Sequence, residues 1–267
     1  METLDFFDSN CRLGQHRRAT PPSLVTARDV VAELDHLEIR EAVVYHATAQ
    51  EYLPSIGNAD IVRAVACEPR LHASWVLPLH PDPGAPPAAQ TVTEMLAHGV
   101  RVARLFPPAS EGYLVAPWAC GGLFEALEQH RVPVLLSGSD LSRAPGVTPH
   151  NGAPGFSVGN IYELCERYPS LPLIITRFNY SHLRVALPML ARFPNLFVEI
   201  SYFTAHGGIE LFCETIGASR IIFGTGMPSG GPGGALVLVR YAAITHEEKQ
   251  LIASANLRRL ISSVRCA

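Results

Sequence analysis

Short apolar runs rich in valine, isoleucine and leucine alternate along the chain with longer stretches whose apolar residues recur at helical spacing. Runs of the first kind are typical of strands buried on both faces of a parallel sheet. The pattern predicts strands at Leu4–Ser9, Glu41–Tyr45, Ala73–Leu79, Arg101–Phe106, Val132–Ser137, Leu173–Arg177, Leu196–Ser201 and Arg220–Thr225. Eight such strands, alternating with helices, close an α/β barrel, so we predict a single-domain (β/α)8 TIM barrel over residues 1–267.

The helical stretches support this alternation. Val25–Leu37 has apolar residues at helical spacing with Thr26 at the N-cap position, and Thr245–Glu248 has the form of a capping box that opens a last helix ending near Ser262. Further helices are predicted over Val158–Tyr168 and Ser181–Phe193. An open, doubly wound sheet is the alternative, but no glycine-rich dinucleotide fingerprint follows the first strand.

The composition narrows the class of protein. Hydrophobic residues make up 48% of the chain and charged residues 17%, which favours a large buried core and excludes a disordered chain. The net charge of −3 indicates neither a nucleic-acid partner nor a membrane surface, and no apolar run is as long as a membrane span. The six cysteines are scattered without a C-x-x-C pair, and the first residues lack a signal-peptide pattern. We therefore expect a cytoplasmic protein whose thiols are reduced rather than paired in disulfides.

The segment Phe6–Gly14 carries Asp8, Asn10, Arg12 and Gly14 at alternating positions. This spacing resembles the first strand of amidohydrolase-related (family 2) proteins, which ends in Asp-x-His-x-His-x-Gly. Asn10 and Arg12 stand where the two histidines of that family would be.

Later segments carry the same resemblance in the family's order. Gly99–Pro107 is similar to the family's fourth strand and Asn256–Leu260 to its final helix. Arg220–Pro228 is similar to the eighth strand, which normally reads Phe-Gly-Thr/Ser-Asp-x-Pro. The resemblance covers nearly the whole chain. It implies a TIM barrel whose chemistry normally depends on a divalent metal that activates water.

The resemblance also places the family's remaining metal ligands on this sequence. The fifth-strand lysine or histidine falls on Ser137, the sixth-strand histidine on Arg177 and the eighth-strand aspartate on Gly226. Arginine and glycine side chains cannot ligate zinc, and serine and asparagine are poor zinc ligands. We therefore predict no bound metal and no other cofactor.

Arginines at former ligand positions suggest that fixed positive charge replaces the metal. Arg12 and Arg177 would point into one cavity from opposite sides of the barrel, and Arg104 would join them. Guanidinium groups suit carboxylate or phosphate. The alternative is that each arginine pairs with a neighbouring acid, such as Asp8 or Glu199, and only holds the barrel together. The predicted substrate-binding residues are Asn10, Arg12, Arg104, Ser137, Arg177 and Tyr202.

Candidate proton-transfer residues follow the predicted strands. His46 ends the second strand, His80 ends the third, and Asp140 follows the fifth. Barrel enzymes place reactive groups at the C-terminal ends of strands, and histidine suits proton transfer near neutral pH. We predict His46, His80 and Asp140 as catalytic residues, with His46 as the first choice. A hydrogen-bonded structural role is the alternative for each, and Glu199 also follows a strand end.

Two other features are interpreted as structural. Cys11 alternates with Asn10 and Arg12 on its strand, so it should face the helix layer and is not proposed as a nucleophile. Ser229–Gly234 is rich in glycine and precedes an apolar helix. A phosphate site at this corner is one interpretation, and a connector is favoured over it.

The leading hypothesis is a metal-independent enzyme that hydrolyses or decarboxylates a small anionic molecule, such as a carboxylate or a lactone. The alternative is a non-catalytic binding or scaffold protein, which the loss of every family ligand favours. A third hypothesis places a metal at an unrelated site built from His46, His80 and Asp140. A homo-oligomer is compatible with all three.

Overall fold

The strands form one parallel barrel. The computed structural model describes residues 3–15, 24–79, 84–106, 117–137, 158–177 and 183–266. Its strands are β1 (Phe7–Leu13), β2 (Glu41–His46), β3 (Leu71–Ala73), β4 (Trp75–Val76), β5 (Ala103–Leu105), β6 (Val134–Ser137), β7 (Leu173–Thr176), β8 (Leu196–Glu199) and β9 (Ile221–Ile222). Strands β1 to β3 form one hydrogen-bonded ladder and β4 to β9 another, and every neighbouring pair is parallel.

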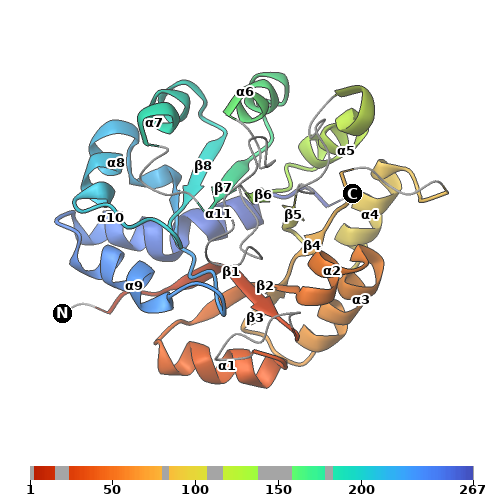
Figure 1. The fold of residues 1–267 in the computed structure, drawn as a ribbon, viewed down its shortest axis with the longest axis horizontal. Helices are drawn as coiled ribbons and strands as arrows, with labels where there is room; N and C mark the ends of the chain where they lie inside the picture. The colour runs from red at the N-terminus through yellow and green to blue at the C-terminus, as the bar shows by residue number, and fades with distance from the viewer. Residues whose placement is uncertain are drawn as a thin grey trace, which may run out of the picture.

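Backbone hydrogen bonds join the two ladders into a ring (Figure 1). The N–H of Ser74 donates to the carbonyl of Val44 at 2.8 Å, which connects the β3–β4 segment to β2. On the other side, the N–H of Ser9 donates to the carbonyl of Phe223 at 3.1 Å. The predicted (β/α)8 barrel is therefore confirmed, and its helices surround the ring as Figure 1 shows.

Every observed strand differs from its predicted bounds by one or more residues, and two of these differences bear on the site. The predicted strand Ala73–Leu79 is observed as β3 and β4, separated by Ser74. The hydroxyl of Ser74 donates to the carbonyl of Val44 and accepts from Nε of Arg104, both at 3.0 Å, so the interruption turns a polar group towards a buried arginine. Strand β1 runs to Leu13 rather than Ser9, and its register shifts between Asp8 and Cys11.

The helices follow from local capping signals. Thr26 and Asp29 form a capping box at the start of α1, and Thr245 and Glu248 form another at the start of α10, as predicted. The helices are α1 (Ala27–His36), α2 (Ala47–Glu51), α3 (Pro54–Val65), α4 (Ala88–Ala97), α5 (Pro117–Gln129), α6 (Val158–Arg167), α7 (Leu183–Arg192), α8 (Gly208–Ile216), α9 (Pro232–Tyr241), α10 (His246–Gln250) and α11 (Asn256–Ser262). A π-helical turn, Leu251–Ala255, joins α10 to α11. None of the described helices is long and apolar enough to cross a membrane.

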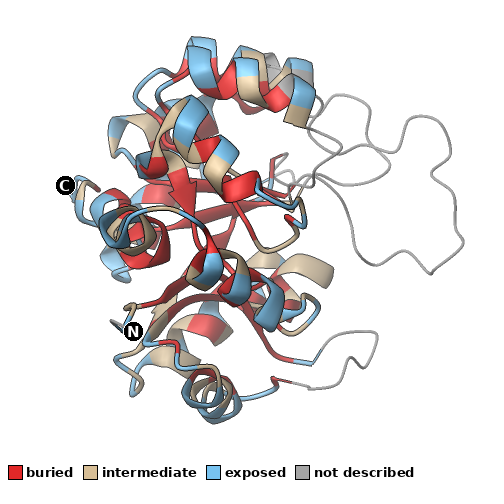
Figure 2. Ribbon diagram, turned by 90° about the vertical axis from the view of Figure 1, so that its left-hand side faces the viewer, coloured by how far each residue is buried: buried red, intermediate tan, exposed pale blue. Residues whose placement is uncertain are grey.

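The core has an outer layer and an inner layer. The outer layer packs the helices against the outward faces of the strands, and it includes the buried Cys11, as predicted. Figure 2 shows the buried strands at the centre, with exposed positions on the outer faces of the helices. The inner layer fills the N-terminal end of the barrel. It consists of Phe7, Val43, Leu135, Ile174, Phe197 and Ile222 from the strands, Val102 just before β5, and Leu257 and Leu260 from α11.

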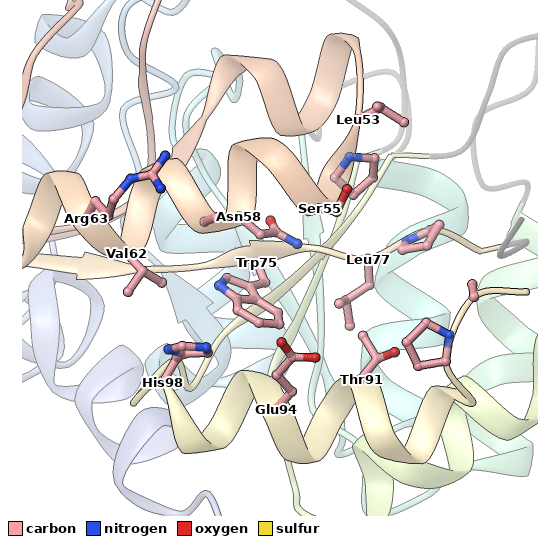
Figure 3. A pocket seen from close by; sticks show the side chains of 15 residues that line it. Leu53, Ser55, Asn58, Val62, Arg63, Trp75, Leu77, Thr91, Glu94 and His98 are labelled. Atoms are coloured by element: carbon pink, nitrogen blue, oxygen red, sulfur yellow. The ribbon is translucent and has the colours of Figure 1, made fainter.

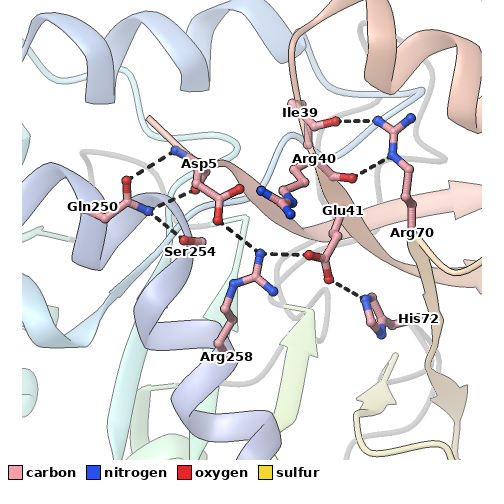
Figure 4. A network of polar contacts seen from close by, with 9 residues as sticks. All are labelled: Asp5, Ile39, Arg40, Glu41, Arg70, His72, Gln250, Ser254 and Arg258. Atoms are coloured by element: carbon pink, nitrogen blue, oxygen red, sulfur yellow. Dashed lines mark hydrogen bonds and ion pairs between the residues drawn. The ribbon is translucent and has the colours of Figure 1, made fainter. Parts of the chain in front are cut away.

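A polar network fixes α11 across the N-terminal face of the barrel (Figure 4). Arg258 of α11 donates from Nη2 to Oε1 of Glu41 at 2.8 Å and to Oδ2 of Asp5 at 3.2 Å. The other carboxylate oxygen of Glu41 contacts Nε2 of His72 at 2.7 Å. Because α11 closes this end, a ligand can reach the interior from the C-terminal end of the barrel, where barrel enzymes carry their sites.

Candidate functional site

A cavity of about 20 Å³ lies at the C-terminal ends of the strands. Five of the predicted substrate-binding residues line it together: Asn10, Arg12, Ser137, Arg177 and Tyr202. The rest of the lining is Tyr45, Phe106, Gly226, Met227 and Ser229. A volume near 20 Å³ holds about one water molecule, so the space between these side chains suits a small polar group and not a whole aromatic ring.

Arg12 is a cavity residue with hydrogen-bond donors that have no partner in the described part of the chain. Its side chain extends from β1, and the residue is only 5% exposed. Its Nε and Nη2 atoms are buried and have no hydrogen-bond partner among the described residues. Buried donors without partners are uncommon in proteins and often mark a ligand or an ordered water. Arg12 thus lines the cavity with two donors that have no partner among the described residues.

Arg177 meets the same cavity directly after β7. Its backbone φ of 58° lies in the left-handed region, which a non-glycine residue seldom adopts and which costs of order 1 kcal/mol. The guanidinium lies over the ring of Tyr202, with Cζ at 5.3 Å from the ring centroid. Burial raises the pKa of Tyr202, so its hydroxyl keeps its proton at neutral pH. The arginine–tyrosine pair forms one wall of the cavity.

Arg104 lies beneath the cavity, which differs from its predicted place beside Arg12 and Arg177. It is 1% exposed and does not line the cavity. Its Nε donates to Oγ of Ser74 at 3.0 Å, its Nη1 to Oδ1 of Asn10 at 2.9 Å, and its Nη2 to the carbonyl of Ser9. Cζ also lies 4.5 Å from the centroid of the Tyr45 ring. All three nitrogens are therefore engaged by neutral protein groups, and Arg104 orients Asn10 rather than facing the cavity.

Two buried carboxylates complete this lower layer. Glu199 accepts hydrogen bonds from Nδ2 of Asn10 at 3.0 Å and from Oγ of Ser201 at 2.8 Å. Asp8 accepts from the backbone N–H of Asn10 at 2.8 Å and of Thr225 at 2.9 Å. Burial raises the pKa of Glu199 to about 7 and also raises the pKa of Asp8. Glu199 therefore changes its protonation near neutral pH, one hydrogen bond away from the cavity lining.

Packing explains why Gly224, in the Phe-Gly-Thr segment, is a glycine. A Cβ on Gly224 would lie 2.4 Å from Oε1 of Glu199 and 2.9 Å from Oγ of Ser9. Only glycine allows the backbone after β9 to approach the buried carboxylate this closely. Thr225, the next residue, donates from its hydroxyl to Asp8. The motif therefore packs against Glu199 and hydrogen-bonds Asp8, although Gly226 itself has no side chain.

The predicted catalytic residues are not brought together among the described residues. His46 does not line the cavity. It caps α2, with Nδ1 accepting from the N–H of Thr48 at 3.3 Å, and burial lowers its pKa. His80 and Asp140 lie outside the described residues, so their roles stay predictions. The sequence did not indicate Tyr45 and Ser74 as part of the site. Both contact Arg104, and a tyrosine or a serine inside an apolar run gives no sign of such a partner.

The pKa of Glu199 yields a prediction for stability. Its pKa is about 7 in the fold against an ordinary 4.5, so between these values the folded state holds a proton that the unfolded state has lost. The free energy of unfolding then falls as pH rises through this window, by about 3 kcal/mol from this group alone. Urea titrations from about pH 4.5 to pH 8 measure this pH dependence of the free energy of unfolding, and we expect Glu199→Gln to lose it. The control, Glu125→Gln at an exposed position on α5, should follow the wild-type curve. If the free energies of unfolding of wild type and Glu199→Gln changed in parallel with pH, the pKa of Glu199 would not be raised in the fold.

An α/β barrel with its polar cavity at the C-terminal mouth is the architecture of a large class of enzymes. The family model for amidohydrolases (Amidohydro_2) matches residues 15–261, and the chain belongs to this family. No curated protein sequence matches the chain.

Solved structures with the same fold include three decarboxylases. The chain is similar to 5-carboxyvanillate decarboxylase from Sphingomonas paucimobilis, with 14% identity, coverage of 98% of this chain and 100% of that chain, and a TM-score of 0.72. It is similar to 2,6-dihydroxybenzoate decarboxylase from Rhizobium, with 16% identity, coverage of 97% and 99%, and a TM-score of 0.71. It is also similar to a dihydroxybenzoic acid decarboxylase from Polaromonas, with 14% identity, coverage of 97% of each chain and a TM-score of 0.71. At these identities the likeness establishes the fold.

Proposed function

We propose that the chain is an amidohydrolase-family enzyme that holds the carboxylate of a small substrate between Arg12 and Arg177. The observation that carries the proposal is the pair of buried Arg12 donors, Nε and Nη2, which have no partner among the residues that the structure describes. Leaving a buried donor unsatisfied costs about 1–3 kcal/mol, and a carboxylate can accept from both arms of a guanidinium. An anion therefore relieves two unsatisfied donors at once.

The cavity limits how such a substrate is held. Its volume of about 20 Å³ accommodates the anionic group between the arginines, and the rest of the molecule extends outward from the mouth. Asn10, fixed by Arg104 and Glu199, presents its amide to the cavity floor, and Ser137 adds a hydroxyl. The Tyr202 hydroxyl, which keeps its proton, is a candidate acid in the cavity lining.

The names of the structural neighbours support an aromatic carboxylate as substrate. All three act, by their names, on aromatic acids, and decarboxylation is their reaction. In a non-oxidative decarboxylation the bond between the ring and the carboxyl carbon breaks, CO2 leaves, and the ring carbon takes up a proton. We propose Tyr202, which lines the cavity and keeps its proton, as the donor of that proton. Hydrolysis, the default reaction of the family, is the second reaction that we propose for the same anion site.

We further propose that this chemistry proceeds without a divalent metal. The Polaromonas neighbour was solved with manganese. Among the described residues of this chain, no group of three His, Cys, Asp or Glu side chains could hold a metal ion. Two arginines face the cavity instead, and a nearby cation would be repelled by them. The described residues therefore do not fit the metal.

A non-catalytic binding protein is the second candidate function. The observation that favours it is the engagement of the lower polar layer, where Arg104, Asn10, Asp8 and Glu199 are tied to one another or to neighbouring polar groups. Such a network can hold a barrel together without taking part in chemistry.

A paired binding and turnover assay tests both candidates. We expect 2,6-dihydroxybenzoate to raise the melting temperature and resorcinol, which lacks the carboxylate, to leave it unchanged, because only the acid can satisfy Arg12. Chromatography measures whether chelator-treated protein consumes the acid. Consumption supports the hypothesis of an enzyme. Stabilisation without consumption supports the binding protein. If several aromatic and aliphatic carboxylates all fail to stabilise the protein, the anion site is wrong.

A further inference from the structure

A second cavity lies outside the barrel, between α3 and α4 (Figure 3). Its volume is about 500 Å³, within the range of about 300–1,000 Å³ for small-molecule sites. Apolar side chains from α3 and from the segments before α3, after β4 and before α4 line most of it, including Leu53, Val62, Leu77 and Pro86, whereas α4 contributes the polar Thr91 and Glu94. The arginine cavity at the barrel mouth shares no lining residue with it.

Trp75 of β4 forms the inner wall of this cavity. Figure 3 shows its ring between the side chains of α3 and those of α4. The residue is only 6% exposed, and its indole Nε1 is buried with no hydrogen-bond partner among the described residues. The ring is held against the ring of His98, with the centroids 5.6 Å apart. A fixed donor is therefore left without an acceptor in an apolar wall.

Asn58 fixes the wall of the cavity that α3 forms beside Trp75. Asn58 of α3 donates from Nδ2 to the carbonyl of Val76 and accepts from its N–H, both at 2.9 Å. These bonds hold α3 against β4 and fix this wall of the cavity. The indole N–H beside it is a buried donor without a partner among the described residues.

The charges around the cavity select against anions. Glu94 of α4 places a carboxylate on the wall, and the charge of Arg63 is paired with Asp60. We propose that the cavity binds a neutral, mainly apolar small molecule that carries one hydrogen-bond acceptor, which accepts from Nε1 of Trp75. This site is independent of the proposed function at the barrel mouth.

The dye Prodan, a neutral aminonaphthalene ketone, tests the proposal by fluorescence titration of the full chain. We expect saturable one-to-one binding that sulfate and 2,6-dihydroxybenzoate do not displace. Ala59→Phe fills the cavity from an exposed position on α3 and should weaken Prodan binding by about tenfold or more. Ala89→Phe, the same change at an exposed position of α4 that does not line the cavity, should bind as the wild type does.

The acceptor is tested with Trp75→Phe, which keeps an aromatic ring but removes the N–H. This variant should weaken Prodan by roughly three- to tenfold and leave the binding of the ketone-free aminonaphthalene unchanged. No saturable binding of Prodan, or equal binding by wild type and Ala59→Phe, overturns the proposed site. Equal losses for both dyes in Trp75→Phe overturn the role of the indole N–H.

Discussion

Arg104→Met is expected to lower the free energy of unfolding by about 3–5 kcal/mol, a loss typical of removing one charge from a buried polar network. The substitution leaves Oδ1 of Asn10, the carbonyl of Ser9 and Oγ of Ser74 without their donor. It also removes a buried cation that interacts with the carboxylates of Asp8 and Glu199. Urea unfolding followed by circular dichroism measures the effect.

The matched control for this variant lies close in the sequence. Arg101 is exposed, so Arg101→Met should change the free energy of unfolding by less than about 0.5 kcal/mol. If Arg104→Met is as stable as Arg101→Met, the hydrogen bonds of Arg104 contribute little and the layer beneath the cavity is not a structural unit.

Arg12→Met is expected to have the opposite profile, with loss of ligand binding and little loss of stability. The substitution removes two buried donors without a partner in the described ranges, so the described fold loses no hydrogen bond at these two atoms. Two charge-assisted hydrogen bonds to the ligand are lost, which corresponds to a decrease in affinity of about 100-fold for an aromatic carboxylate. Calorimetric titration with 2,6-dihydroxybenzoate measures the loss, and urea unfolding measures the stability.

Arg101→Met serves as the control here too, and its affinity should equal that of the wild type. Wild-type affinity in Arg12→Met would contradict the anion site. A large loss of stability in that variant would instead indicate that Arg12 has a structural partner.

The barrel was predictable because hydrophobic periodicity and capping residues act locally. Apolar runs mark β2 and β6 to β8 within a few residues, and the capping boxes at Thr26 and Thr245 are set by neighbours three positions away. The break at Ser74 was not predictable. It depends on Arg104, thirty positions further along the chain, and a serine inside an apolar run gives no sign of that partner.

The candidate site was predictable in part for a related reason. Positions that share the C-terminal edge of a parallel barrel meet in space. The resemblance to the family's metal-ligand positions singled out Asn10, Arg12, Ser137 and Arg177, and these four residues line one cavity. The depth of each side chain depends on packing across the barrel. Arg104 therefore lies a layer lower than predicted, and His46 is used as a helix cap.

A crystal structure of the protein with 2,6-dihydroxybenzoate tests the central claim most directly. The account predicts the carboxylate within hydrogen-bonding distance of Nε and Nη2 of Arg12 and close to the guanidinium of Arg177, with the Arg104–Asn10–Glu199 layer unchanged beneath it. Arg12 and Arg177 paired with carboxylates of the protein itself, and no ligand between them, would contradict it.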